Sequence, residues 1–373
     1  PVLSITRPLA DALLEGRTTA ELEKELTAAL APVAVPTRGT VDAEVEMQRH
    51  TVDGLNVVGM VDGTDPSRAQ ECIILGAHYD HLGMGGPGSG SRRPDTSAVH
   101  NGADDNASGT AAIIEIAERI AADPLPRPVV VVAFTAEEMG LLGSKHFAAN
   151  PPVDIGKATL MCNLDMVGRM KEGEKSMTVG GTGTAKGLST LVEDVITAHG
   201  FAAKMSPEGY GPSDHAAFYT RDIPVLFFFT GVHEDYHTPD DDADRLNYAG
   251  GVQVANVVAD IIAAVAKRQD ALAYTEAGPK SRPSTSKRFK VTLGIMPDVS
   301  SSESRGLRAD AVMPDRPAAR AGMKKGDIIV AMEGKPVDGV YQYMDRLSEF
   351  KPGQRISVEV LRDGEKVVLI VEL

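Results

Sequence analysis

Short apolar runs alternate with longer segments of helical periodicity along residues 56–269, and this alternation is the strongest constraint on the fold. The runs have the length of strands and are apolar throughout, as expected of strands that are covered on both faces. Strands that alternate with helices predict an α/β fold with helices on both faces of the sheet. The predicted strands are Asn56–Val61, Cys72–Ala77, Val129–Phe134, Thr159–Leu164 and Pro224–Phe229, and the predicted helices are Ser108–Ala122, Leu141–Ala149, Ala185–His199, Ser213–Tyr219 and Tyr248–Gln269.

Two segments before this region also show periodicity. Residues 19–30 are amphipathic at helical spacing, which predicts a helix that packs through one face. Between residues 41 and 48, apolar side chains alternate with acidic or polar ones, which predicts a half-exposed strand.

A change in composition divides the chain. Residues 276–288 (EAGPKSRPSTSKR) are rich in Pro, Ser and basic side chains and have no apolar periodicity, so they are predicted to be an exposed linker. The net charge is −14, but residues 1–275 carry −17 whereas residues 287–373 are nearly neutral. We therefore expect two domains, residues 31–275 and residues 289–373, which suits a chain of 373 residues.

The composition excludes several classes of protein. The acidic balance argues against a nucleic-acid-binding surface but is compatible with bound metal ions. The only two cysteines, Cys72 and Cys162, lie in predicted strands and are expected to be buried free thiols. No apolar run approaches the roughly 18 residues needed to span a membrane, so no membrane span is expected.

Polar residues of metal-binding type follow the predicted strands. Each motif alone has an ordinary explanation, such as a helix cap or a solvated helix start, and residues 240–242 are predicted to be a solvated turn. In an α/β sheet, however, ligand sites form at the carboxyl ends of the strands. A site for two metal ions, held by imidazole and carboxylate groups, explains the whole series better. The series is His78, Asp104-Asp105, Glu137-Glu138, Asp165 and residues 233–237.

At this point the motifs resemble a known family over residues 40–270. The segments GAHYDHLG, NGADDNASGT, FTAEEMGLLGS, NLDMVGR, SDHAAF and DYHTPDD are similar, in the same order, to those of the bacterial leucyl aminopeptidase-like dinuclear zinc exopeptidases. The wider superfamily includes glutamate carboxypeptidase II and the glutaminyl cyclases. The resemblance implies a zinc exopeptidase fold, with a mixed, mostly parallel sheet, and two Zn²⁺ ions per chain.

The resemblance also implies a role for each matching residue. Asp105 would bridge both ions, and its bond to Asn106 is a place where the family often has a cis peptide. Asp80 would orient His78, and Glu137 would be the general base. The implied ligands are His78, Asp105 and Asp165 for one zinc, and Asp105, Glu138 and His237 for the other.

These roles imply an aminopeptidase that removes N-terminal residues, apolar ones in the leading interpretation, from peptides with a free N-terminus. Glu137 would take a proton from a water molecule that the metal activates, and would pass it to the leaving amine. Tyr236 would stabilise the oxyanion. The acidic surroundings suit a positively charged substrate amine. Six apolar residues near these motifs could form a substrate pocket or could be part of the core. They are Phe227, Phe228, Phe229, Met166, Phe218 and Tyr219.

Residues 289–373 resemble a bacterial PDZ domain, most specifically at Pro317–Met323 and Gly326–Ile329. By resemblance, this domain would hold the C-terminal carboxylate of a peptide with backbone N–H groups, and the peptide would add as a strand. A domain that packs and binds nothing is the alternative. The binding residues would be Leu293, Gly294, Ile295 and Met296; the predicted elements are a strand at Arg288–Ile295, a helix at Val340–Phe350 and a hairpin of Arg355–Leu361 and Lys366–Leu373.

Two other functions remain open. A glutaminyl cyclase-like acyltransferase would use the same fold with one zinc, and an inactive PDZ scaffold would have lost a ligand or Glu137. The complete ligand set disfavours both. Relatives with this layout are usually exported, so the resemblance implies an extracytoplasmic location, periplasmic or secreted. The opening residues also resemble the tail of a protease-associated insert, and residues 1–30 are therefore expected to be a remnant of one.

Overall fold

The computed structural model describes residues 5–14, 16–29, 35, 51–281, 291–297 and 306–373. It divides into two compact units, residues 1–53 and residues 54–373. In the first unit α1 (Arg7–Leu13) contacts α2 (Thr19–Ala29), which confirms the helix expected over residues 19–30. The strand expected between residues 41 and 48 lies outside the described residues.

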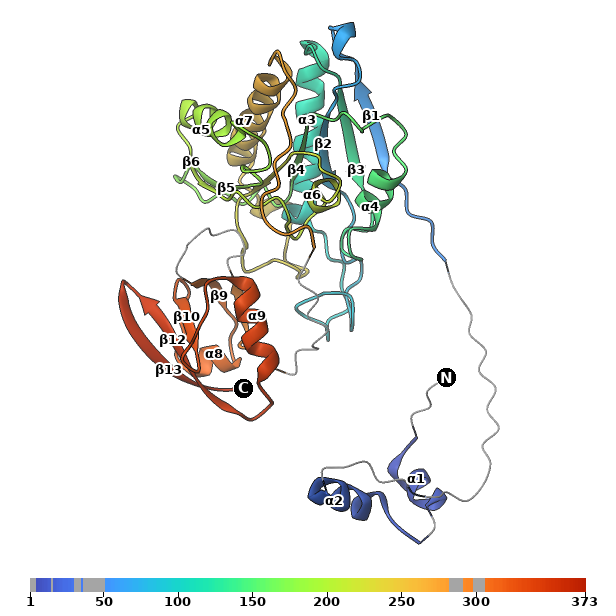
Figure 1. The fold of residues 1–373 in the computed structure, drawn as a ribbon, viewed down its shortest axis with the longest axis vertical. Helices are drawn as coiled ribbons and strands as arrows, with labels where there is room; N and C mark the ends of the chain where they lie inside the picture. Colours follow the sequence, from blue (N-terminus) through green and yellow to red (C-terminus); the bar gives the residue numbers. More distant parts are fainter. Residues whose placement is uncertain (1–4, 15, 30–34, 36–50, 282–290, 298–305) are drawn as a thin grey trace. The chain divides into compact units, whose positions relative to one another are not determined.

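A seven-stranded sheet forms the centre of residues 54–281 (Figure 1). Its order is β1-β3-β2-β4-β7-β5-β6. The neighbouring strands β3, β2, β4 and β7 run parallel to one another. β1 joins β3 and β5 joins β7 in antiparallel fashion, so the sheet is mixed and mostly parallel, as the resemblance implies. The strands are β1 (Val57–Val61), β2 (Ile73–His78), β3 (Val129–Phe134), β4 (Leu160–Leu164), β5 (Ser176–Gly180), β6 (Ala202–Met205) and β7 (Val225–Phe229).

Each face of the sheet is covered by its own helices. On β2, Ile73 and Leu75 belong to a core that includes α3, α5 and α7, whereas Ile74 belongs to a core that includes α4 and α6. Burial on both faces explains why apolar residues predominate in the central strands β2, β3, β4 and β7. The helices are α3 (Gly109–Ala122), α4 (Leu142–Ala149), α5 (Leu188–Ala198), α6 (His215–Tyr219) and α7 (Tyr248–Ala266).

The predicted strands and helices of this part are all present, with ends that differ by a few residues. Cys72 and Cys162 are buried free thiols, as expected. The sequence reading missed β5 and β6. β5 contains Ser176 and Thr178, and β6 is only four residues long with half-exposed side chains, so neither has the apolar run that marks the other strands.

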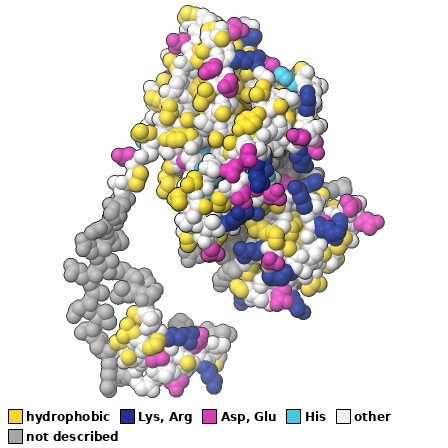
Figure 2. All heavy atoms as spheres, turned by 180° about the vertical axis from the view of Figure 1, so that it is seen from behind, with side chains coloured by type: hydrophobic (Ala, Val, Ile, Leu, Met, Phe, Trp, Pro, Cys, Tyr) yellow, Lys and Arg dark blue, Asp and Glu magenta, His cyan; other side chains and the backbone are white. Residues whose placement is uncertain are grey.

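Among the described residues, α7 is the one helix that is long and apolar enough to cross a membrane. Half of its most apolar window is buried, and its inward side chains, such as Val257 and Ile261, lie in the core that includes α3 and α5. Its other face exposes Tyr248 and Val252. On the side of the molecule shown in Figure 2, apolar side chains reach the surface among charges of both signs. The expectation that no apolar segment approaches this length is therefore wrong for α7, whose length and hydropathy are explained by its place in the core.

A second, β-rich fold with its own hydrophobic core occupies the described part of residues 291–373. Its strand order is β13-β12-β10-β9-β8, with β11 paired to β10. The expected hairpin is confirmed, because β12 and β13 pair antiparallel up to Arg362 and Glu365. The strand expected at 288–295 lies outside the described residues up to residue 290, and the prediction is wrong for residues 291–294, which are not in a strand; β8 begins only at Ile295. The elements are β8 (Ile295–Pro297), β9 (Leu307–Val312), α8 (Pro317–Arg320), β10 (Ile328–Met332), β11 (Lys335–Pro336), α9 (Val340–Glu349), β12 (Arg355–Arg362) and β13 (Glu365–Glu372).

Candidate metal centre

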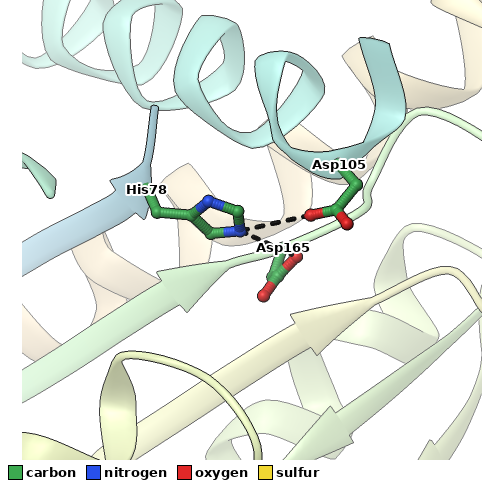
Figure 3. Close-up of side chains that lie close together, drawn as sticks. All are labelled: His78, Asp105 and Asp165. Carbon is green, nitrogen blue, oxygen red and sulfur yellow. Dashed lines mark ion pairs between the residues drawn. The ribbon is translucent and has the colours of Figure 1, made fainter. Parts of the chain in front are cut away.

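Three side chains from separate segments meet at the carboxyl ends of β2 and β4 (Figure 3). His78 is the last residue of β2, Asp165 directly follows β4, and Asp105 lies in the turn that leads into α3. The Nε2 atom of His78 is 3.3 Å from Oδ1 of Asp105 and 3.6 Å from Oδ1 of Asp165. We call these residues the first donor group; they are the set that the resemblance assigns to one zinc.

The other oxygen of Asp105 belongs to a second donor group, formed with Glu138 and His237. Oδ2 of Asp105 is 3.1 Å from Nε2 of His237, and this nitrogen is 3.3 Å from Oε1 of Glu138. Glu138 follows β3, and His237 lies in the loop after β7. Asp105 thus offers one carboxylate oxygen to each group, which is the arrangement that a bridging ligand requires.

The turn that carries Asp105 is held from two sides. The carboxylate of Asp241 accepts hydrogen bonds from the backbone N–H groups of Asp104 and Asp105, at 3.0 and 3.1 Å. The Asp105–Asn106 peptide bond is cis, at the place the resemblance implies, and the Asn106 side chain donates to the carbonyl of Leu164 at 2.9 Å. The prediction of a solvated turn at residues 240–242 is wrong for Asp241, which is fully buried because it binds these two N–H groups.

Asp80 acts differently from the expectation. Its carboxylate lies 3.8 Å from Nδ1 of His78, and the closer partner of that nitrogen, at 3.1 Å, is the backbone carbonyl of Asp80. The carboxylate instead accepts hydrogen bonds from the backbone N–H groups of Glu137 and Glu138, at 3.0 and 3.3 Å. One residue therefore fixes the His78 ring through its backbone and the Glu137-Glu138 pair through its side chain.

His237 is held by two neighbours. Its Nδ1 atom lies 3.2 Å from the carbonyl oxygen of Gly90, which leaves Nε2 directed at the second donor group. The ring of Tyr236 stacks on the imidazole, with centroids 3.8 Å apart. Burial raises the pKa of the Tyr236 phenol, and the charges of Asp105 and Glu138 raise it further, so this hydroxyl remains protonated and able to donate a hydrogen bond.

The surroundings of Glu137 favour the protonated form of its carboxyl. Burial raises the pKa of its carboxyl to about 9, and the charges of Asp165 and Asp214 raise it while that of His78 lowers it. A bound cation would act in the opposite direction. Glu137 is not a member of either donor group, although it is adjacent in sequence to Glu138. Glu137 therefore lies next to the second donor group in the sequence without contributing a donor atom to it.

The two donor groups fit zinc. Imidazole nitrogen and carboxylate oxygen are zinc ligands, and atoms bound at about 2.0–2.2 Å to one ion lie roughly 3.3 Å apart. The separations of 3.1, 3.3 and 3.6 Å agree with this value. Burial lowers the pKa of His237, but the carboxylates of Asp105 and Glu138 raise it to about 10, which reflects an excess of negative charge that cations would balance.

The apolar residues considered for a substrate pocket divide into two sets. Met166, Phe227 and Phe229 form a small cluster with Val232 and Tyr236, beside the donor groups. Side chains alternate along β7, so Phe228 points to the other face and belongs to the main core. The remaining two candidates belong to the core that includes α4 and α6 and are not available to a substrate; they are Phe218 and Tyr219.

Sequence reasoning gave no role to His81, which the structure brings to the second donor group. Its Nδ1 atom is 3.0 Å from Oε1 of Glu138 and 3.8 Å from Oδ2 of Asp105. The only signal in the sequence is its position one residue after Asp80, because the contact depends on a glutamate 57 residues away.

Comparison with known protein families gives two matches. The family described as peptidase family M28 matches residues 56–262, which is more than half of the chain. The family described as PDZ domain matches residues 291–373.

Curated relatives match the first of these regions. Aminopeptidase YwaD of Bacillus subtilis is 31% identical over 203 residues, which are 50% of this chain and 40% of that protein. Leucine aminopeptidase 1 of Ajellomyces capsulatus is 26% identical, over 59% of this chain and 58% of that protein. The chain thus spans about half the length of these relatives. Among solved structures, a zinc aminopeptidase from Bacillus subtilis is 25% identical, with a TM-score of 0.48 and coverage of 58% of this chain and 51% of that one.

Proposed function

Because the chain belongs to peptidase family M28 and carries a PDZ domain, we propose that it is a dizinc aminopeptidase that removes residues, preferably apolar ones, from the free N-termini of peptides. The observation that carries the proposal is that the two oxygens of Asp105 face two separate donor groups. The named relatives are aminopeptidases, which supports the reaction class.

The residues that would hold the two ions are those of the two donor groups. His78 and Asp165 would hold one, Glu138 and His237 the other, and Asp105 both. Zinc bound there supplies Lewis acidity, which polarises a carbonyl group and makes a water molecule a stronger acid.

The chain's own residues would manage the protons. Cations at the donor groups would lower the pKa that burial raises at Glu137, so that its carboxylate accepts the proton of the attacking water and delivers it to the nitrogen of the leaving amine as the peptide C–N bond breaks. Tyr236 remains protonated, and its hydroxyl donates a hydrogen bond to the oxygen that gains negative charge. The Asp80 carboxylate keeps Glu137 in place because it accepts a hydrogen bond from the backbone N–H group of Glu137.

The substrate preference rests on what surrounds the donor groups. The carboxylates favour a positively charged N-terminal amine over a blocked one. An apolar side chain would pack against the partly exposed Val232 and Tyr236, which lie on the buried cluster of Met166, Phe227 and Phe229.

A pair of peptides tests this function. The two would share one sequence with an N-terminal leucine, and one of them would carry an N-acetyl group. We expect the zinc-loaded chain to release leucine from the free peptide and to leave the acetylated one intact, as followed by mass spectrometry. A third peptide with an N-terminal aspartate should be cleaved more slowly. Cleavage of the free and acetylated peptides at similar rates would contradict the proposal.

We also propose that the PDZ domain binds peptide C-termini beside β8. This strand pairs with β9 on one side and is the last in the described sheet order, so its other edge can accept a strand. The binding segment is the one predicted, Leu293, Gly294, Ile295 and Met296. Fluorescence anisotropy should show that a C-terminal peptide binds and that its amidated form does not; equal affinities would refute carboxylate recognition.

An extracytoplasmic location is also part of the proposal and rests on the resemblance to exported relatives. Detection of the chain in fractionated cells would test it, and confinement to the cytoplasmic fraction would contradict it.

A further inference from the structure

His81 has a position that its neighbours in the sequence do not explain. It is not part of β2, yet its imidazole is almost buried, with 7% of the side chain exposed. The ring lies edge-on to that of His237, with centroids 5.6 Å apart. It therefore stands beside the second donor group, on a different segment from the other members of that group.

The ring nitrogens of His81 have no hydrogen-bond partner among the described residues. Nδ1 is 3.0 Å from Oε1 of Glu138, but the two atoms do not have hydrogen-bond geometry, and this oxygen is also buried without a partner. Buried polar atoms are rarely left in this state. A nitrogen and an oxygen that lie close together without a bond between them are arranged as two ligands of one cation would be.

The separations agree with that arrangement. Nδ1 of His81 lies 3.0 Å from Glu138 and 3.8 Å from Oδ2 of Asp105, which bracket the roughly 3.3 Å expected between two atoms bound to one zinc. The same oxygen atoms are those that face His237. Nδ1 of His81 and Nε2 of His237 thus approach the same two oxygen atoms, whereas the first donor group has a single imidazole.

The backbone around Asp105 leaves room for the ring. Gly102 has φ = 61°, and a Cβ atom on it would lie 2.6 Å from Cγ of His81. A side chain at this position would collide with the His81 imidazole and with the backbone carbonyl of Asp105, at 2.5 Å from its oxygen. The glycine that opens the Asp105 turn therefore leaves the space that the His81 ring occupies.

We propose that His81 is a fourth protein ligand, through Nδ1, of the metal ion held by Asp105, Glu138 and His237. This inference rests on the proposed two-metal centre. Its consequence is that the two ions are held unequally. A site with four protein ligands is closed and binds tightly, whereas a site with three keeps an open position, so the ion held by His78 and Asp165 would exchange first.

Metal binding to the full chain tests this inference without a measurement of activity. The metal-free protein would be titrated with Co²⁺ and followed by visible absorption, and the zinc-loaded protein would be dialysed against increasing dipicolinate and its zinc content measured. For the wild type we expect two ions, lost in two separate steps. For His81→Ala and His81→Gln we expect the more tightly held ion to bind at least about tenfold more weakly, with an altered Co²⁺ spectrum.

His146→Ala is the matched control, because His146 is exposed on α4, and it should behave as the wild type does. If His81→Ala does not fold, the His81→Gln variant decides the result. Two ions with wild-type affinities and spectrum in a folded His81 variant would overturn this inference and leave the proposed function intact. Fewer than two ions in the wild type would overturn both.

Discussion

At the scale of single residues, the proposed mechanism assigns metal binding and proton transfer to different side chains. Asp105 and Glu138 present oxygens to the donor groups, while Glu137 lies beside them without belonging to either. The Asp80 carboxylate holds the backbone of both glutamates, so the pair is fixed as a unit although its side chains have different roles.

Replacement of Glu137 tests this separation. Glu137→Gln should lower kcat by about 10²–10⁴-fold, because the amide cannot accept a proton, while the metal content stays at the wild-type value. Glu138→Gln is the comparison and should lose metal as well as activity, since it removes a charged donor atom. Kinetics and elemental analysis on the same samples would check both. Substantial turnover by Glu137→Gln would disprove its role as the base.

At the scale of elements, α7 shows how burial determines the contribution of a side chain to the free energy of unfolding. Ile261 is fully buried in the core that includes α3 and α5, whereas Val252, on the same helix, is 61% exposed. The mean hydropathy of the helix does not distinguish these two positions. They differ because one lies on the helix face that packs in the core and the other on the exposed face.

The two positions give a direct stability comparison. Ile261→Ala should lower the free energy of unfolding by about 2–5 kcal/mol, because it removes buried methylene and methyl groups and leaves a cavity. Val252→Ala should change it by no more than about 0.5 kcal/mol. Denaturant unfolding would measure both, and similar values for the two variants would mean that α7 does not pack as described.

In the PDZ domain, the pairing of Asp327 with Arg362 joins β10 to β12. Burial raises the pKa of the Asp327 carboxyl, but hydrogen bonds from the Arg362 guanidinium, at 2.8 and 2.7 Å, and from the Lys324 N–H group outweigh this effect and lower it. A lowered pKa in the folded state means that the stabilisation is present above the ordinary pKa of about 4 and is lost as the pH falls through the folded value.

The thermal stability of this domain should therefore depend on pH through Asp327. We expect Asp327→Asn to lower the unfolding temperature at pH 7 and to flatten its decrease between about pH 5 and pH 3. Asp345→Asn, which changes an exposed aspartate on α9, is the control and should keep the wild-type profile. A profile for Asp327→Asn that runs parallel to the wild type would contradict the assigned pairing.

At the scale of the whole molecule, the sequence predicted what depends on local pattern. Apolar runs placed five strands, and the polar residues after them predicted a two-metal site at the strand ends, whereas the residues of each donor group came from the resemblance to a family. Other features needed the fold itself. β5 and β6 have weak patterns; Phe228 separates from Phe227 and Phe229 only because strand side chains alternate; and the buried role of Asp241 depends on a turn more than 130 residues away.

The central claim also concerns the whole molecule: we propose that the M28 part is a peptidase whose activity depends on two metal ions. The most direct test is to remove the metal with a chelator, add zinc back in measured amounts, and record leucine release and bound zinc together. We expect release to fall to background without metal, to return with zinc, and to reach its maximum at two bound ions per chain. Release that continues in protein with no detectable metal, or that never returns when two zinc ions are bound, would contradict the account.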